Sequence, residues 1–228
     1  MSFLPTPTKL VRGHFVSEGK TRFKATVRVN GRERPCYVPF SSKLSSHVEL
    51  GANPVRLSRR LTSEGEVLDL AWLKLGSKWS FVDLRQVNAL VADCLFGHLS
   101  VEARPGAEVK VGDVYRADFA DPATRELWEV KALLSATSRV SFPAMALERA
   151  GRQLATLVEL QAQGWKVNLI LVCLNPGLRS YQLNPKYQEF SAHFEQLLRG
   201  GTTVTGLAVH RRIGSDLPRL KWAKLDRV

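Results

Sequence analysis

Two neighbouring stretches decide the fold: YRADF at residues 115–119 and WEVKA at residues 128–132. Both are short and rich in apolar residues, and the segment between them contains an Asp-Pro pair, which predicts two strands joined by a turn. The two-residue period of a strand places Glu129 and Lys131 on one face and apolar side chains on the other. A hairpin-like connection would bring the carboxylate of Asp118 beside Glu129. The sequence therefore predicts three charged side chains within strands that otherwise belong to the core.

These charges need compensation, because two carboxylates about 4 Å apart repel each other by about 4 kcal/mol at an effective dielectric constant near 20. Lys131 is one group that could offset the repulsion, and a hard divalent cation is another, since such ions prefer carboxylate and carbonyl oxygens. In the second case Asp118, Glu129 and the Val130 carbonyl would hold Mg²⁺ or Mn²⁺. Lys131 would then position or polarise a water for in-line attack on a phosphodiester. The alternative is a surface salt bridge, because Glu-x-Lys is a common pattern.

The chain around these stretches alternates between helical and strand-like periods, which is typical of an α/β domain. The run 167–174 is almost wholly apolar, as a central strand covered on both faces would be. Asn184-Pro185 predicts a helix start, and Gly164 and Gly200 predict helix ends. We expect helices at residues 86–97, 144–163 and 184–199, and strands at 99–102, 114–119, 127–134, 167–174 and 203–210.

The N-terminal part has only strand-like segments. A run of alternating apolar residues at 23–29 is followed by Asn30-Gly31, the strongest short hairpin signal, and further short strands are expected at 54–57, 67–73 and 79–82. This spacing predicts a small all-β barrel of the oligonucleotide-binding (OB) type at residues 1–80, followed by a mixed sheet flanked by helices at 81–228. The alternative is an edge sheet of one larger domain with a solvated charged face.

The formal net charge is +12, and residues 1–61 carry twelve basic against three acidic side chains, a local balance of +9. Such a basic module predicts a polyanionic partner, with nucleic acid, DNA or RNA, as the first candidate and an anionic membrane surface as the second. The sequence lacks an amphipathic helix with a basic face, which disfavours the membrane. The side chains expected to bind nucleic acid are Arg12, Lys20, Arg22, Lys24, Arg28, Lys43, Arg56, Arg59 and Arg60.

Composition excludes several other classes of protein. With 228 residues, 44% hydrophobic and 24% charged, the chain is neither disordered nor a disulfide-stapled miniprotein. Three widely spaced cysteines among apolar neighbours predict reduced thiols, and no stretch is long enough for a signal peptide or a membrane span. We therefore expect a cytoplasmic protein. The five histidines show no metal-ligand spacing, and neither a serine-nucleophile motif nor a phosphate-cradling glycine loop occurs.

Several motifs occur together in a fixed order. They are Asn88 to Asp93, Asp118-Phe119, the stretch 128–131, Phe142-Pro143, Glu148-Arg149 and Pro185-Lys186-Tyr187. In this order and spacing the chain resembles the sugar fermentation stimulation protein family over most of its length. The resemblance implies an N-terminal OB-like barrel followed by a nuclease domain of the PD-(D/E)xK superfamily.

Carried over by position, the resemblance makes Asp118 and Glu129 metal-binding carboxylates and Lys131 the catalytic lysine. Asp93 matches a helix position that is usually glutamate and would add an outer carboxylate near the metal. Glu148 and Arg149 match a Glu-Arg pair in which the arginine would hold a phosphate and the glutamate would orient the arginine or Lys131. For this pair the alternative is an exposed helix start.

The chain also departs from the family pattern. Ala144 stands where an aspartate is expected, Ala150 replaces the usual glycine, and Gln153 replaces a histidine. In the first domain the Pro-Asn-Thr-Gly-Ser-like turn is PFSSK at residues 39–43. These changes bear on substrate choice and rate more than on the reaction class.

The sequence thus predicts a Mg²⁺-dependent nuclease of DNA or RNA whose basic barrel grips the substrate. The alternative is a non-catalytic, regulatory nucleic-acid-binding protein that retains a nuclease fold. The presence of Asp118, Glu129 and Lys131 together favours the enzyme, because a binding module would gain nothing from buried acids that repel phosphate.

Overall fold

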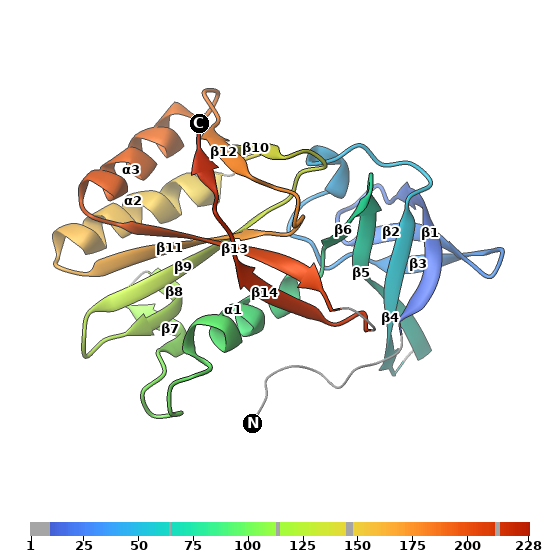
Figure 1. Ribbon diagram of the computed structural model, residues 1–228, viewed down its shortest axis with the longest axis horizontal. Coiled ribbons are helices and arrows are strands. Elements are labelled where there is room, and N and C mark those ends of the chain that lie inside the picture. The colour runs from blue at the N-terminus through green and yellow to red at the C-terminus, as the bar shows by residue number, and fades with distance from the viewer. Residues whose placement is uncertain (1–9, 64, 113–114, 145–147, 213–214) are drawn as a thin grey trace.

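The computed structural model describes residues 10–63, 65–112, 115–144, 148–212 and 215–228 (Figure 1). The chain first builds a barrel of strands, seen at the right of Figure 1, and then a mixed sheet with helices on both sides. The predicted combination of an OB-like barrel with a nuclease-like α/β part is confirmed.

The barrel is formed within a six-stranded sheet of the order β3-β2-β1-β4-β5-β6. The pairing Tyr37↔Asp69 between β3 and β5 closes the first five strands, whereas β6 extends the sheet as a hairpin with β5. A closed ring excludes the alternative of a simple edge sheet. The strands are β1 (Val11–Glu18), β2 (Lys24–Val29), β3 (Arg32–Tyr37), β4 (Pro54–Thr62), β5 (Gly65–Leu75) and β6 (Lys78–Phe81).

The predicted hairpin at Asn30-Gly31 is confirmed. Val29 pairs with Arg32, so the loop has two residues, and both have positive φ, +50° at Asn30 and +77° at Gly31. Two consecutive positive φ angles are the signature of the type I′ turn, whose twist matches that of the strands it joins.

The second part is built on a six-stranded sheet in the order β14-β13-β11-β9-β8-β7. The three central strands β13, β11 and β9 run parallel, and the outer ones are antiparallel to their neighbours. β11 is buried from its second residue to its last, as the apolar run predicted. The strands are β7 (Gly106–Val111), β8 (Tyr115–Asp121), β9 (Glu126–Leu133), β11 (Lys166–Cys173), β13 (Thr203–Arg211) and β14 (Pro218–Trp222).

Within the described residues, three α-helices cover this sheet. α2 (Glu148–Ala162) and α3 (Gln188–Arg199) bury Leu154, Leu157 and Phe194 against one face. α1 (Val87–Phe96) packs on the other face, where the barrel also lies. A small parallel sheet of β10 (Arg139–Phe142), β12 (Ser180–Leu183) and β15 (Asp226–Arg227) lies beside the helical face, and two short 3₁₀ helices span Leu44–Ser46 and Leu84–Gln86.

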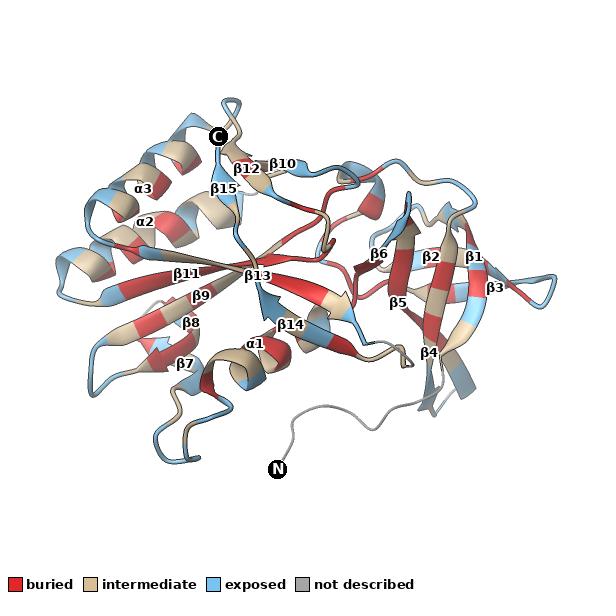
Figure 2. Ribbon diagram, viewed as in Figure 1, coloured by how far each residue is buried: buried red, intermediate tan, exposed pale blue. Residues whose placement is uncertain are grey.

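The barrel and the sheet share one hydrophobic core. Buried side chains of the barrel, α1 and the α1 face of the mixed sheet form a single cluster, and Figure 2 shows buried residues along both the barrel strands and β11. Several hydrogen bonds join the parts: the Leu84 amide donates to the Pro39 carbonyl (3.0 Å), the Trp72 indole donates to the Asp216 carbonyl (2.9 Å), and the Phe81 amide at the end of β6 donates to the Leu174 carbonyl (2.9 Å). The predicted boundary between residues 80 and 81 falls inside β6, before its last residue Phe81, and we retain it as a proposed division.

The strand expected at 99–102 is wrong. These residues form turns in which the amides of Ala103 and Arg104 donate to the carbonyls of Ser100 and Val101. Arg104 also donates to the carbonyls of Gly97 and Leu99. The segment therefore satisfies the backbone at the end of α1, which competes with strand pairing.

The expected helix starts also shift. α3 begins at Gln188, because the Asn184 side chain accepts from the Lys186 amide and donates to the Pro143 carbonyl, which makes a turn instead of a helix cap. α2 is described from Glu148 onward; Ala144, where the helix was expected to begin, is not helical, and residues 145–147 lie outside the described residues. None of the helices in the described ranges is sufficiently long and apolar to cross a membrane.

Candidate active site

Asp118 lies where the pairing between β8 and β9 ends. The two strands pair from Phe119↔Trp128 to Asp121↔Glu126, and beyond Phe119 they separate. The Val130 amide would lose its partner here, but Asp118 Oδ2 accepts its hydrogen bond at 2.8 Å. The carboxylate thus replaces a strand carbonyl at the break in the ladder.

The second oxygen of Asp118 faces α1. Asn88, in the first turn of this helix, donates its Nδ2 to Asp118 Oδ1 at 2.8 Å. Burial and the charge of Glu129 raise the pKa of Asp118 from about 3.8 to about 6, although the hydrogen bonds from Val130 and Asn88 and the charge of Lys131 act in the opposite direction. Asp118 and Glu129 are therefore close enough to interact, as the hairpin predicted.

Glu129 is buried, with 3% of its surface exposed, and each of its oxygens has a donor. Oε2 accepts from the Tyr115 hydroxyl at 2.5 Å, and Oε1 accepts from Lys131 Nζ at 2.6 Å. Burial and the nearby carboxylates raise the pKa of Tyr115, so that its hydroxyl stays protonated and can donate. A buried carboxylate with two such donors is held in one orientation.

Lys131 reaches across to α2. Its ammonium donates to Gln153 Oε1 at 2.9 Å in addition to Glu129. Glu129 and Lys131 share one face of β9, as the strand period predicted. The lysine is thereby fixed between a carboxylate and a neutral amide, at the edge of solvent, with 17% of its side chain exposed.

A cleft of about 590 Å³ opens in front of Lys131. The barrel contributes Arg22, Phe23 and His47 to its lining, and the second part contributes Asn88, Lys131, Gln153 and residues of β10. Asp118 and Glu129 do not line it themselves; they lie one contact behind Asn88, Val130 and Lys131. The cleft therefore joins the two parts of the molecule at the predicted catalytic lysine.

The carboxylate pair has the chemistry of a hard-cation site. Each of its four oxygens accepts one hydrogen bond and so retains lone-pair capacity. No group of three or more His, Cys, Asp or Glu side chains suited to a metal occurs within the described residues. Two carboxylates with open positions fit Mg²⁺ well, because this ion is commonly held by one or two carboxylates, waters and substrate phosphates.

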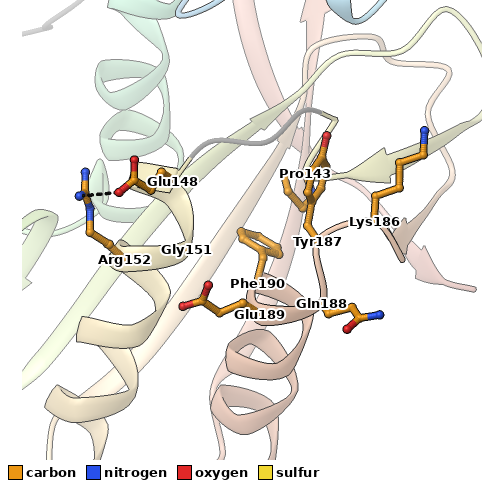
Figure 3. A pocket seen from close by; sticks show the side chains of 9 residues that line it. All are labelled: Pro143, Glu148, Gly151, Arg152, Lys186, Tyr187, Gln188, Glu189 and Phe190. Atoms are coloured by element: carbon orange, nitrogen blue, oxygen red, sulfur yellow. Dashed lines mark hydrogen bonds and ion pairs between the residues drawn. The ribbon is translucent and has the colours of Figure 1, made fainter.

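The two residues of the predicted Glu-Arg pair face different hollows. Arg149 lines the cleft, as Gln153 does four residues later. Glu148 instead bonds to Arg152 at 3.0 Å, and both line a second hollow of about 430 Å³ between α2 and α3 (Figure 3). The row formed by Arg149 and Gln153 and the row formed by Glu148 and Arg152 lie about 100° apart around the axis of α2. The structure brings Arg149 to the cleft but does not bring Glu148 to Lys131.

Asp93 is not brought to the carboxylate pair either. It is exposed on α1 and lies five residues after Asn88, which corresponds to about 140° around the helix axis. Since Asn88 faces Asp118, Asp93 points away from this direction. The predicted third carboxylate near the metal therefore has no support from the geometry.

The nine predicted nucleic-acid-binding side chains divide into two groups. Arg28, Arg56, Arg59 and Arg60 form ion pairs with Glu33, Asp216, Glu66 and Asp69, respectively. Arg12, Lys20, Arg22, Lys24 and Lys43 form no ion pair with another residue of the described ranges. Of the nine, Arg22 lines the cleft.

Sequence reasoning missed two residues that hold the carboxylates, Tyr115 and Asn88. Tyr115 precedes Asp118 in the same stretch, and its place on the Glu129 side follows only from the pairing of β8 with β9. Asn88 stood out as the start of a helix, but its partner lies thirty residues away and carries no local signal. Gln153 appeared only as a departure from a histidine.

Comparison with known proteins agrees with this architecture. Residues 85–213, more than half of the chain, match the family described as "Sugar fermentation stimulation protein RE domain", SfsA. The chain belongs to this family. A solved structure of SfsA from Pyrococcus furiosus, in complex with Ca²⁺, is similar with a TM-score of 0.78 at 16% sequence identity. The similarity covers 100% of this chain and 99% of that one, and at such identity it establishes the fold alone. Among curated proteins, none matches the chain.

Proposed function

We propose that this SfsA-family chain is a metal-dependent nuclease that hydrolyses phosphodiester bonds of DNA or RNA. The observation that carries the proposal is the arrangement of Asp118, Glu129 and Lys131 behind a cleft shared by a basic barrel and an α/β part. The raised pKa of Asp118, caused by burial and by Glu129, supports a site built for an additional cation. The Ca²⁺ in the similar P. furiosus structure supports a divalent ion in this fold.

A Mg²⁺ ion bound by Asp118 and Glu129 would supply charge neutralisation for the attacked phosphate. Tyr115 and Asn88 keep the two carboxylates oriented. Lys131 Nζ donates hydrogen bonds at the cleft wall, where it can orient a water for in-line attack. In that step the water oxygen bonds to phosphorus and gives up a proton to solvent, the bond from phosphorus to the leaving sugar oxygen breaks, and that oxygen takes up a proton from solvent.

Two further groups would place the substrate. Arg149, at the start of α2, lines the cleft near Gln153 and can hold a phosphate oxygen through a charge-assisted hydrogen bond. The barrel presents Arg22 to the same cleft and carries further cations for which the described residues provide no carboxylate partner. These cations favour a polyanionic chain over a small neutral substrate.

The test is cleavage of labelled single- and double-stranded DNA and RNA in Mg²⁺, Mn²⁺ or EDTA. We expect Lys131→Ala to lower the rate by about 10²- to 10⁴-fold while divalent-ion binding, measured by calorimetry, persists. Asp118→Ala should lower both cleavage and ion binding. The matched control is Lys166→Ala, which removes another Lys-Glu pair on the same sheet, Lys166–Glu126 at 2.8 Å, at the opposite end of β9.

Undiminished cleavage in EDTA, or full activity of either variant, would refute the assignment. Tight nucleic-acid binding without cleavage in any metal would favour the non-catalytic alternative.

A further inference from the structure

Phe23 has an unusual position on the barrel wall of the cleft. It ends the loop between β1 and β2 with φ of +72°, and its carbonyl accepts from the Val38 amide at 2.9 Å. A bulky side chain in this left-handed region is rare and strained, whereas glycine would adopt it freely. The turn itself therefore gives no reason for a phenylalanine, yet the ring lines the same cleft as Lys131.

The ring belongs to a stack of aromatic and cationic groups. Phe23 and Tyr37 lie nearly parallel, with centroids 5.9 Å apart and an interplanar angle of 17°. The Arg22 guanidinium lies 4.9 Å from the Phe23 centroid, and those of Arg85 and Arg60 lie 5.5 and 6.0 Å from the Tyr37 centroid. The barrel wall thus presents two rings with cations at both ends.

The two ends of the stack differ in how firmly they are held. Arg60 and Arg85 both bond to the buried carboxylate of Asp69, at 2.9 and 2.8 Å, and Arg85 also bonds to buried Asp83. Arg22 is exposed and has no carboxylate partner in the described ranges. The Tyr37 end is therefore anchored, and the Arg22 end can rearrange when a ligand arrives.

This combination matches the chemistry of an unpaired nucleotide. A base stacks on an aromatic face, and a free guanidinium beside it binds the adjoining phosphate. In a duplex each base is already covered by its neighbours, so it offers no face to a ring inside a cleft. The volume of about 590 Å³ also lies in the range of pockets that enclose small ligands.

We propose that Phe23, supported by Tyr37, is a stacking platform for an unpaired base and that the cleft takes single-stranded nucleic acid. This inference rests on the proposed nuclease function, for which it names the substrate class. Arg22 would leave the ring to bind a phosphate, while the strand continues toward Lys131 on the opposite wall.

The experiment measures binding in EDTA, so that its result does not depend on cleavage. Affinities of the full chain for short labelled oligo-dT, oligo-U and a DNA duplex of equal length are compared by fluorescence anisotropy. Phe23→Ala and Phe23→Leu should weaken single-strand binding by about 5- to 100-fold and duplex binding by less than about 2-fold. Phe23→Tyr, which keeps a ring, should bind as the wild type does, and oligo-dT against oligo-U distinguishes DNA from RNA.

Two further variants and a stability measurement accompany the Phe23 series. Trp222→Ala removes another exposed aromatic side chain, on β14 at the far edge of the sheet, and should change neither affinity. Phe23→Trp introduces a fluorophore whose emission should be quenched by the single strand. Thermal midpoints of all variants are compared with that of the wild type.

Equal weakening of single-strand and duplex binding, or unchanged affinity in Phe23→Leu, would overturn the platform and leave the nuclease proposal standing. Selective loss of single-strand binding supports it, and it does so even if Mg²⁺ produces no cleavage, in which case the nuclease proposal alone would fail.

Discussion

Asp118 is half-buried, and it differs from the buried carboxylates in the groups that face it. Asp69 and Asp83 pair with arginines and Glu129 pairs with Lys131. Asp118 instead accepts hydrogen bonds from neutral groups only, the Val130 amide and the Asn88 side chain. Burial and the charge of Glu129 raise the pKa of Asp118, because these neutral donors and the charge of Lys131 offset them only in part.

This environment predicts a pH dependence of stability in metal-free protein. Because the folded-state pKa is raised to about 6, the folded chain binds more protons than the unfolded one between about pH 4 and pH 6. The contribution of Asp118 is thus favourable below this window and is lost as the pH rises through it, which amounts to about 3 kcal/mol. Thermal unfolding in EDTA at several pH values measures the loss.

Asp118→Asn removes the titration and nearly keeps the shape. We expect the variant in EDTA to have a higher thermal midpoint than the wild type at pH 7.5 and a flatter profile between pH 4 and pH 6. Mg²⁺ should raise the midpoint of the wild type more than that of the variant. A variant that loses stability to the same extent as the wild type with rising pH would show that other groups dominate.

Single residues also show how much of the site can be predicted from sequence. Glu129 and Lys131 share a face because of strand periodicity alone, and this needs no tertiary information. The hydrogen bond from Tyr115 to Glu129 and the one from Asn88 to Asp118 depend on how β8 and α1 lie against β9. Such partners satisfy a buried charge in three dimensions and leave no spacing pattern in the chain.

At the scale of elements, segments with a strong local signal in the sequence were predicted, and short strands without such a signal were not. β11 follows from one apolar run, and the Asn30-Gly31 hairpin follows from turn chemistry. The segment 99–102 has alternating apolar residues, but Val101 is 72% exposed and Arg104 uses the segment to close the end of α1. Short strands such as β10, β12 and β15 form only because they pair with one another, so they had no signal of their own.

Helix α2 carries two arginines, Arg149 and Arg152, that line different hollows and can be compared in one experiment. Arg149 faces the cleft, and Arg152 faces the second hollow, where it pairs with Glu148. Arg149→Ala should lower the cleavage rate by about 10²- to 10³-fold, because a phosphate contact that strengthens in the transition state is lost. Arg152→Ala should change rate and stability by less than about 0.5 kcal/mol, since its ion pair is highly exposed.

Cleavage rates and thermal midpoints of the two variants, measured together, separate the roles. A rate near that of the wild type for Arg149→Ala would remove this residue from the site. Equal losses in the two variants would point to a general effect of charge instead of a specific phosphate contact.

At the scale of the whole molecule, hydrophobic packing joins the barrel to the α/β part, and the basic side chains of the barrel divide into paired and unpaired groups. The barrel core continues into α1 and one face of the sheet as one hydrophobic cluster, whereas β10 and α2, which also line the cleft, belong to a second cluster. Of the net charge of +12, +9 arises from residues 1–61. The structure shows that part of this charge is used internally, since Arg28, Arg56, Arg59 and Arg60 are paired with carboxylates. Net charge in the sequence could not reveal this division.

The difference between paired and unpaired basic side chains predicts which of them determine the salt dependence of nucleic-acid binding. Lys20 lies in the β1–β2 connection that carries Phe23, and Lys24 is the first residue of β2. Both are exposed, and neither has a carboxylate partner in the described ranges. Arg28 pairs with Glu33, and Arg59 shares Glu66 with Arg34. Each phosphate contact to a single strand contributes about −0.7 to the slope of log affinity against log salt, because it releases condensed counterions.

Replacing both Lys20 and Lys24 by alanine should therefore make the slope less steep by about 1.4. The double replacement of Arg28 and Arg59 should change it much less. Binding of oligo-dT in EDTA over about 50 to 200 mM salt measures both slopes. Equal changes in the two double variants would mean that the barrel attracts the strand through its total charge and not through the unpaired lysines beside the cleft.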